Sequence, residues 1–297
     1  MPISLLRATL ARQPFKLKDQ FKLVLGCLLY PTAARRWLGF VAQRPVLVEG
    51  ARLHAHLLNK VFRPYLSTRF SVTQRVEVLI NHYGTVQALG LEALAGRAMH
   101  EPQLLFEGKT KSDEPFAVHL VAAFDGHREG EWCLRLSFKG EILFVLNLVL
   151  QQGDAGLRMV VGRLQGSASE QARELVRLAT REFHACRPAT LLVTAARQLA
   201  QVLGCRELLL VSNRDRIALN PWRRWHISSD YDQTWTEMGA RPGENGFFVI
   251  EPQGLQDVDF TAIASKKRSE AKKKAALLDE IYTTLQQRFG VAPRSFT

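Results

Sequence analysis

The stretch "VVGRLQGSAS", residues 160–169, combines residue types that could hold a phosphate group. It follows an apolar run and precedes a long helical pattern, so we expect a strand to end near Leu164 and a helix to begin near Ser169. The unpaired N–H groups and the dipole at a helix start attract anions, and a glycine lets a pyrophosphate approach the backbone. The candidate ligand-binding residues are Arg163, Gln165, Gly166, Ser167 and Ala168.

This stretch resembles the pyrophosphate-binding loop of the GNAT acyltransferases, which hold acyl-CoA. Arg163, Gly166 and Ala168 fit the pattern R-x-x-G-x-A. In that superfamily the loop follows the fourth strand of a meander, and a helix and another strand come next; here two helical patterns precede the next strand. The resemblance implies acyl-CoA as the cofactor. The alternative is a strand-to-helix turn in which Ser167 or Ser169 caps the helix.

A polar and aromatic cluster further along the chain offers candidate catalytic residues. It contains Asp232 and Glu237 beside Tyr231 and Trp235. Either carboxylate could serve as the general base that takes a proton from an amine acceptor. The alternative interpretation is a short, capped helix whose Trp235 packs inward on a sheet.

The histidines and cysteines do not have the spacing of a metal site. His54 and His56 fall in a helical pattern that stops near Pro64, and their separation places them on different faces of a helix. The four cysteines are far apart, which excludes zinc-type spacing and a disulfide scaffold. We therefore expect no metal and a reducing compartment.

Positive charge is concentrated at the start of the chain. The 297 residues carry a net charge of +12, and residues 1–70 contain twelve Lys or Arg but only two acidic residues. Such a skew favours an anionic neighbour: a membrane surface, a phosphorylated ligand or nucleic acid. Solubility alone is the alternative, and no recognisable nucleic-acid-binding motif is present. The basic run 265–274 has the same two interpretations, a solvated helix face or a phosphate contact.

The apolar run "LVLGCLLY", residues 23–30, has only eight residues, whereas a membrane-spanning helix needs about 20. We expect a basic, amphipathic helix that stays attached to the mature protein and touches anionic lipid. A helix that packs on the main domain is the alternative. The expected localisation is cytoplasmic, peripheral at the inner membrane.

The remaining pattern predicts a helical region followed by a sheet. Helical periodicity, interrupted by prolines, extends to about residue 100. From about residue 103 the sequence alternates between apolar and polar residues and contains turn residues. Lys139-Gly140 and Gly153-Asp154 are hairpin signals. The predicted elements are strands at 131–138, 141–151, 156–164 and 206–213, and helices at 169–186 and 189–203.

The expected fold class is α/β (α+β): a basic helical region, then a mixed, largely antiparallel sheet with helices, GNAT-like in its middle. The expected domains are residues 1–100, helical and basic, and residues 101–297, α/β.

Six ordered stretches resemble the VirK/YbjX family of bacterial proteins, whose domain has no known function. The resemblance covers about residues 50–285, and it implies a role in virulence, envelope or stress physiology, with a DNA-damage response in some annotations. This chain departs from the family pattern at Arg216, Ala271 and Ala275, where a histidine and two aromatic residues are usual, and at "IEP" (250–252). The stretches are "FEGKTKSDEPFAVHL" (106–120), "REGEWCLRL" (128–136), "GRLQG" (162–166), "ELLLVSN" (207–213), "SDYDQTWTEMGA" (229–240) and "IASKKRSEAKKKAALLDEI" (263–281).

Two functions follow from these observations. The first is acyl transfer from an acyl-CoA to an amine, with the 163–168 loop holding the pyrophosphate. The second is a non-enzymatic binding protein whose basic helices meet anionic lipid or nucleic acid.

Overall fold

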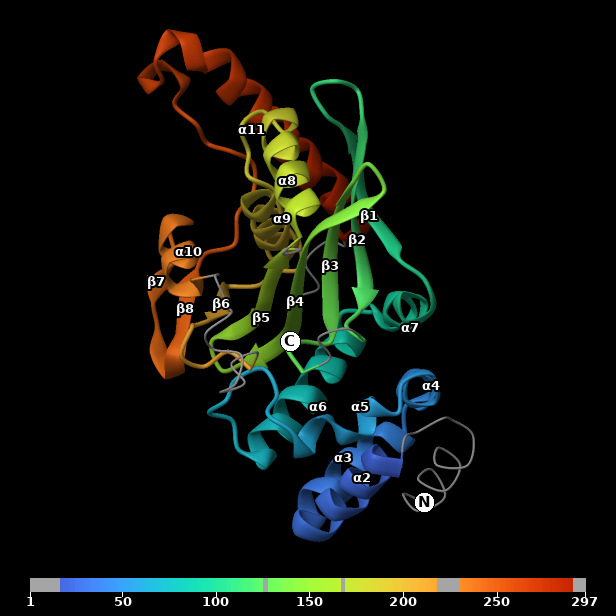
Figure 1. Ribbon diagram of the computed structural model, residues 1–297. Coiled ribbons are helices and arrows are strands. Elements are labelled where there is room, and N and C mark those ends of the chain that lie inside the picture. Colours follow the sequence, from blue (N-terminus) through green and yellow to red (C-terminus); the bar gives the residue numbers. More distant parts are fainter. Residues whose placement is uncertain (1–16, 125–127, 167–168, 218–229, 291–297) are drawn as a thin grey trace.

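The computed structural model describes residues 17–124, 128–166, 169–217 and 230–290. A helical part comes first in the chain, and an eight-stranded sheet with further helices follows it (Figure 1). The predicted fold class is therefore confirmed: a helical N-terminal region precedes a mixed, largely antiparallel sheet with helices.

The helical part lies at the lower end of the sheet in Figure 1, and its helices begin at clear sequence signals. Pro31 and Pro45 each occupy a first helical position, where the missing N–H costs nothing. Ser71 caps the longest of these helices through a capping box with Gln74. The elements are α2 (Leu17–Leu29), α3 (Pro31–Ala42), α4 (Pro45–Leu53), α5 (His56–Asn59), the 3-10 turn η1 (Lys60–Phe62), α6 (Val72–Ala88) and α7 (Glu92–His100).

One predicted helix is interrupted. His54 and His56 were expected in one continuous helix, but α4 ends at Leu53 and α5 begins at His56. His54 between them has extended backbone, with φ −140° and ψ 93°. The prediction was wrong because a tertiary contact replaces the helical one: the His54 ring stacks on Phe124, with 3.6 Å between ring centres.

The sheet has the strand order β1-β2-β3-β4-β5-β6-β8-β7, and among the described residues β5 and β6 form its single parallel pair. The predicted hairpin between β3 and β4 is present, since Lys139 and Gly140 both have positive φ, as a tight two-residue turn requires. The strands are β1 (Gln103–Lys109), β2 (Pro115–Ala122), β3 (Trp132–Phe138), β4 (Glu141–Gly153), β5 (Gly156–Gly166), β6 (Glu207–Val211), β7 (Arg241–Pro242) and β8 (Phe247–Ile250).

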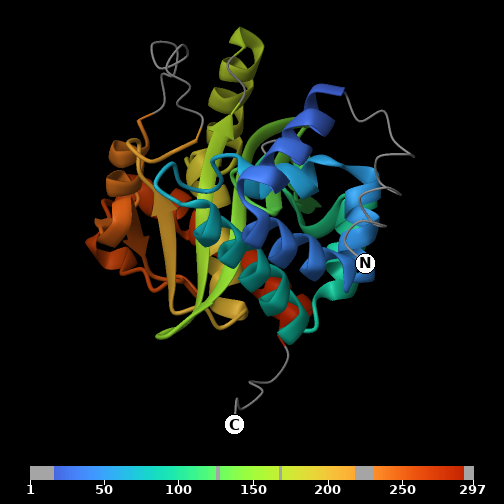
Figure 2. The same ribbon diagram turned by 90° about the horizontal axis from the view of Figure 1, so that it is seen from below.

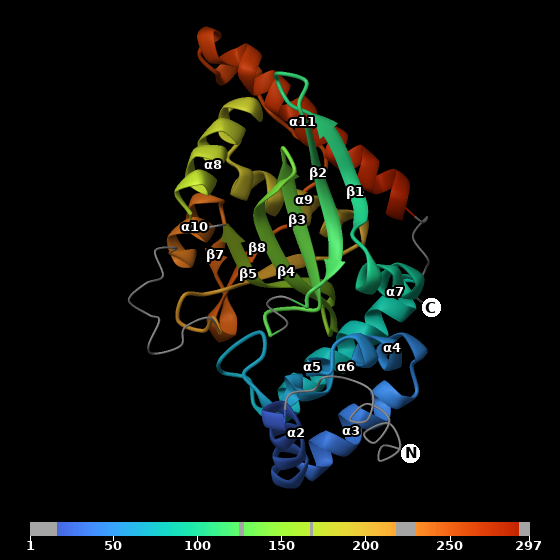
Figure 3. The ribbon, with the colours of Figure 1, turned by 45° about the vertical axis from the view of Figure 1, so that its right-hand side comes forward.

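Two helices carry the chain from β5 to β6, and this crossover is what makes the two strands parallel. The second of them packs with the C-terminal helix on one face of the sheet, and Figure 3 shows that C-terminal helix behind β1 and β2. The elements are α8 (Glu170–Glu182), α9 (Pro188–Val202), α10 (Tyr231–Glu237), the 3-10 turns η3 (Glu244–Gly246) and η4 (Phe260–Ala262), and α11 (Ser265–Phe289).

The helical part and the sheet share one hydrophobic core. A single cluster of buried side chains includes Leu23 of α2, Val160 of β5 and Leu285 of α11. The helices of the first part end at His100 and the first strand begins at Gln103. The division into domains 1–100 and 101–297 stays a prediction.

Candidate functional site

The candidate site lies where β5 continues without β6 beside it. The two strands are paired over Arg158–Val161 and Glu207–Leu210, and β6 ends one residue later. Within the described ranges, β5 goes on to Gly166 with only β4 as a strand partner. Residues 162–166 therefore present backbone groups on the side that β6 has left, and we call this segment the β5 edge.

A tyrosine side chain occupies part of the β5 edge. The Tyr231 hydroxyl accepts a hydrogen bond from the Leu164 N–H, at 2.9 Å, and donates one to the Leu164 carbonyl, at 2.7 Å. One phenol thus makes both bonds that a neighbouring strand would make. Helix α10 holds it there, because Asp230 caps the helix and Trp235, fully buried, donates to the Val211 carbonyl at 2.8 Å.

Charged side chains surround this phenol. Glu129 and Arg163 form an ion pair at 3.4 Å, with 11% and 19% of the side chains exposed. The Arg216 guanidinium, buried, lies 4.5 Å from the centre of the Tyr231 ring. Burial raises the pKa of Glu129, and the positive charges of Arg163, Arg128 and Arg216 partly offset this rise. Asp230 also interacts with Arg216, so three arginines face two carboxylates and leave a local excess of positive charge.

Two glycines allow the turn that carries Glu129 to reach the sheet. A Cβ atom on Gly162 would lie 2.2 Å from the Glu129 carbonyl oxygen, and one on Gly130 would lie 2.6 Å from the Leu148 nitrogen. Neither position tolerates a side chain without movement of backbone, so the stretches "REGEWCLRL" and "GRLQG" meet at this point. The contact fixes Glu129 against the β5 edge.

The structure brings two of the predicted ligand-binding residues together. Arg163 Nε donates to Gln165 Oε1 at 2.8 Å, in addition to its ion pair with Glu129. Gly166 is the last residue of β5, and a Cβ atom there would lie 2.9 Å from the Phe144 ring. Ser167 and Ala168 lie outside the described residues. Binding of a ligand by this loop stays a prediction.

The strand end and the helix start lie where the sequence placed them. β5 ends at Gly166 and α8 begins at Glu170. The Ser169 hydroxyl accepts a hydrogen bond from the Ala172 N–H at 3.1 Å, so one of the two capping serines considered for this turn does cap the helix. A capped helix start and a phosphate site at the same loop are compatible, because a cap satisfies only one of the unpaired N–H groups.

The two predicted catalytic carboxylates make structural contacts. Asp232 Oδ1 accepts a hydrogen bond from the Asn213 N–H at 2.7 Å and so ties α10 to the end of β6. Glu237 is exposed at the other end of α10 and pairs with Arg187 at 3.6 Å. The capped helix with an inward tryptophan is present as the alternative described it. Catalysis by Asp232 or Glu237 stays a prediction.

Glu129 was not singled out by sequence reasoning, and Tyr231 was noted only as an aromatic neighbour. Both reach the β5 edge through tertiary contacts that no spacing encodes. The available signal was the stretch "REGEWCLRL", where an acidic residue next to a glycine precedes an apolar strand.

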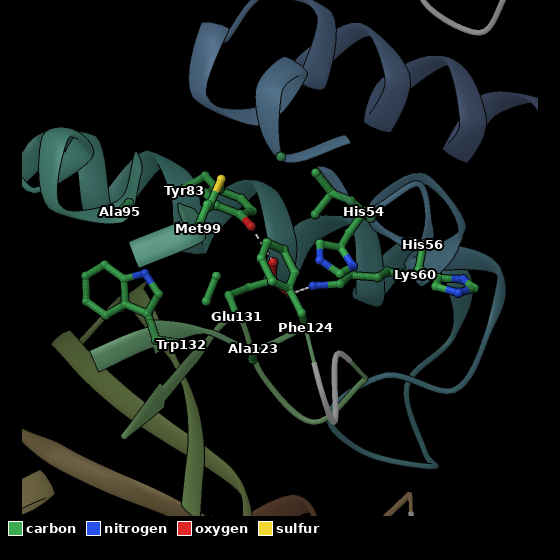
Figure 4. A pocket seen from close by; sticks show the side chains of 13 residues that line it. His54, His56, Lys60, Tyr83, Ala95, Met99, Ala123, Phe124, Glu131 and Trp132 are labelled. Carbon is green, nitrogen blue, oxygen red and sulfur yellow. Dashed lines mark hydrogen bonds and ion pairs between the residues drawn. The ribbon is translucent and has the colours of Figure 1, made fainter. Parts of the chain in front are cut away.

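A second group of buried polar side chains surrounds Glu131, two residues after Glu129 (Figure 4). Its carboxylate accepts hydrogen bonds from Lys60 Nζ at 2.6 Å, from the Tyr65 hydroxyl at 2.7 Å and from the Tyr83 hydroxyl. The adjoining pocket of about 20 Å³ is large enough for about one water molecule. The three donors come from the helical part and Glu131 directly precedes β3, so this cluster connects the helical part to the sheet.

The part of the chain that the structure describes contains neither a cluster of metal ligands nor a membrane-spanning helix. No three His, Cys, Asp or Glu side chains gather there as metal ligands would. None of the helices within those ranges combines the length and the hydropathy that crossing a bilayer requires.

Comparison with known proteins confirms the resemblance found in the sequence. A family model described as "Protein of unknown function (DUF535)" matches residues 12–287. "Uncharacterized protein YbjX" of Escherichia coli (strain K12) is 25% identical, over 90% of this chain and 82% of its own length. An uncharacterized protein of Haemophilus influenzae is 27% identical, over 86% and 84%.

Two further likenesses are weaker. "Membrane protein LapB" of Mannheimia haemolytica is 27% identical over 64% of this chain and 81% of its own length. A solved structure, a cAMP-binding acyltransferase from Mycobacterium smegmatis, has a TM-score of 0.30 and 9% identity over 74% of this chain. This chain spans 63% of that acyltransferase, and a TM-score this low carries no argument about activity.

Proposed function

The chain belongs to DUF535, a family of proteins of unknown function, and we propose that this member transfers an acyl group from an acyl-CoA to an amine. The observation that supports the proposal is the β5 edge, where a side chain and not a strand satisfies the backbone of Leu164. The pantetheine arm of CoA contains amide groups, which can pair with a strand edge as an added strand does. The Tyr231 hydroxyl and the donor would compete for the same backbone groups.

Local charge fits an anionic donor. Arg163, Arg128 and Arg216 outnumber the carboxylates of Glu129 and Asp230, the second of which also interacts with Arg216, and the start of α8 adds its positive dipole end. In the proposed complex Arg163 exchanges part of its contact with Glu129 for a phosphate oxygen. The residues proposed to hold the pyrophosphate are Arg163, Gln165, Gly166, Ser167 and Ala168.

Glu129 is proposed to position Arg163, which lies 3.4 Å from it. It is not the proposed general base, because the pantetheine arm separates the pyrophosphate from the thioester. The proposed base is Asp232 or Glu237, which would accept a proton from the amine as the C–N bond forms and return it to sulfur as the C–S bond breaks. The variants Asp232→Asn and Glu237→Gln separate the two candidates.

Calorimetric titration of the protein with CoA tests the donor site. We expect measurable affinity in the wild type and at least about tenfold weaker affinity in Gly166→Val, because a β-branched side chain blocks approach to the backbone. Ser169→Ala is the control: it removes the helix cap and about 1 kcal/mol of stability while leaving the phosphate contacts in place.

Three results are decisive in this titration. Weaker affinity in Gly166→Val alone, with thermal unfolding close to that of the wild type, supports the site; the unfolding measurement is needed because the new side chain also meets the Phe144 ring. Absence of affinity in the wild type contradicts the proposal and favours the non-enzymatic alternative, binding of anionic lipid or nucleic acid. Affinity that survives Gly166→Val places the donor elsewhere on the protein.

The proposed setting follows from the donor and from the family. Acyl-CoA is a cytoplasmic metabolite, so we propose a cytoplasmic protein. The VirK/YbjX resemblance suggests envelope, virulence or stress physiology as the process in which an acylated amine is needed.

A further inference from the structure

Helix α2 presents an apolar face to the outside of the molecule. Seven of the nine large hydrophobic side chains that are exposed among the described residues belong to residues 17–30. Leu17, Phe21 and Leu28 are exposed by 82%, 67% and 73%. The other members of the group are Val24, Leu25, Leu29 and Tyr30.

These positions form one stripe. Residues 17, 21, 24, 25, 28 and 29 recur at intervals of three and four, which places them along a single side of a helix. A soluble helix normally turns such a side toward the core, and an exposed stripe of this kind marks an interaction surface.

The opposite side of α2 is fixed to the protein, so the stripe cannot rotate inward. Leu23 is fully buried, and Gly26 lies so close to Phe62 that a Cβ atom would meet its ring at 2.4 Å. The side chain of Asn59 donates to the Asp19 carbonyl at 3.1 Å. Figure 2, which views the molecule from below, shows the helical part in front of the sheet, and Figures 1 and 3 place α2 at its outer end.

The charge around the stripe is positive. Residues 17–70 contain nine Lys or Arg and two acidic residues. Lys22, which pairs with Asp19 at 3.5 Å, stands at the edge of the stripe with 38% of its side chain exposed. Arg35 and Arg36 of α3 are exposed nearby in the chain, and Arg36 pairs with the exposed Glu77 at 3.3 Å. Lysine and arginine side chains beside an apolar stripe can reach lipid headgroups while their stems stay in the apolar layer.

We propose that the α2 stripe inserts into the surface of an anionic membrane, with α2 lying in the plane of the interface. A helix of 13 residues is about 20 Å long, too short to cross a bilayer but sufficient to lie flat on it. The stripe is carried by one helix, and the excess of basic residues complements anionic headgroups. This docking is independent of acyl transfer, since it uses neither the β5 edge nor Glu129.

Co-sedimentation of the full chain with lipid vesicles tests the proposal. We expect the protein to pellet with vesicles of phosphatidylglycerol and phosphatidylcholine and much less with phosphatidylcholine alone. The double variant Phe21→Ser/Leu28→Ser should bind the anionic vesicles at least about tenfold more weakly, because two large apolar side chains no longer enter the lipid. The matched control is Ile142→Ser/Leu255→Ser, which removes exposed apolar side chains elsewhere, at 47% and 61% exposure.

The same variants show which results would contradict the proposal. Absence of wild-type binding to anionic vesicles overturns the proposal, and so does equal binding by the Phe21→Ser/Leu28→Ser variant. A wild-type dimer in sedimentation velocity that becomes a monomer in this variant overturns it too, since the stripe would then face a second copy. All four substituted side chains are exposed, so unchanged thermal unfolding verifies that each variant is folded.

Discussion

At the residue scale, the phenol of Tyr231 has two consequences that can be separated. Replacing Tyr231 by Phe leaves the N–H and C=O of Leu164 unpaired in a buried place, which should cost about 1–3 kcal/mol of unfolding free energy. If the phenol and the donor compete for Leu164, the same variant should bind CoA more tightly than the wild type. Thermal unfolding and calorimetry measure the two effects, and weaker CoA binding by the variant contradicts the competition.

His82 gives the protein a dependence on pH. It is fully buried, its Nδ1 accepts a hydrogen bond from the Leu150 N–H at 3.0 Å, and burial lowers its pKa to about 4. In the unfolded chain His82 binds a proton below about pH 6.5, whereas in the native protein it does so only below about pH 4. Between these two pH values protonation favours the unfolded chain. Stability from this residue is therefore lost as the pH falls from about 6.5 toward 4.

The variant His82→Asn isolates this contribution. An amide oxygen can replace Nδ1 as the acceptor for Leu150, but an amide does not titrate in this range. We expect the difference in unfolding temperature between wild type and variant to shrink steadily as the pH falls from 7 to 4.5. A constant difference would show that His82 is not the group that titrates.

At the element scale, the hairpin and the start of α8 were predictable because local chemistry determines them. Lys139-Gly140 demands a tight turn, and Ser169 follows an apolar strand as a helix cap should. The break at His54 was not predictable, because it depends on a stacking contact with Phe124, 70 positions away in the sequence. Local signals describe elements well where no distant side chain competes with them.

In the candidate site too, contacts between near neighbours in the sequence were predictable and contacts between distant segments were not. Arg163 and Gln165 are near neighbours in one strand, and their contact could be anticipated from their spacing. Glu129 reaches them only because Gly162 leaves room for its backbone, which is a property of packing and not of either sequence stretch alone. Sequence reasoning therefore located the loop but not the carboxylate beside it.

At the scale of the whole molecule, contacts across the junction connect the helical part and the sheet. The Lys60 ammonium and the hydroxyls of Tyr65 and Tyr83 come from the helical part and bond to Glu131, which precedes β3. Arg69 pairs with Asp215 at 2.7 Å, just beyond β6. Removal of the helical part would take all three of these donors from the Glu131 carboxylate and would expose the part of the shared core that the helices cover.

We therefore predict that residues 1–100 and 101–297 unfold together. Loss of one partner from a buried ion pair costs about 3–5 kcal/mol, a large share of the stability of an ordinary domain. The full chain should show one calorimetric transition, with helix and sheet signals lost at the same temperature. Lys60→Met should lower that temperature without splitting the transition, because it removes the cation that pairs with Glu131, a buried carboxylate that both parts enclose. Arg52→Met provides the control, since its ion pair with Glu49 is exposed. Two separate transitions in the wild type would mean that each part folds on its own and that the Glu131 cluster only joins them.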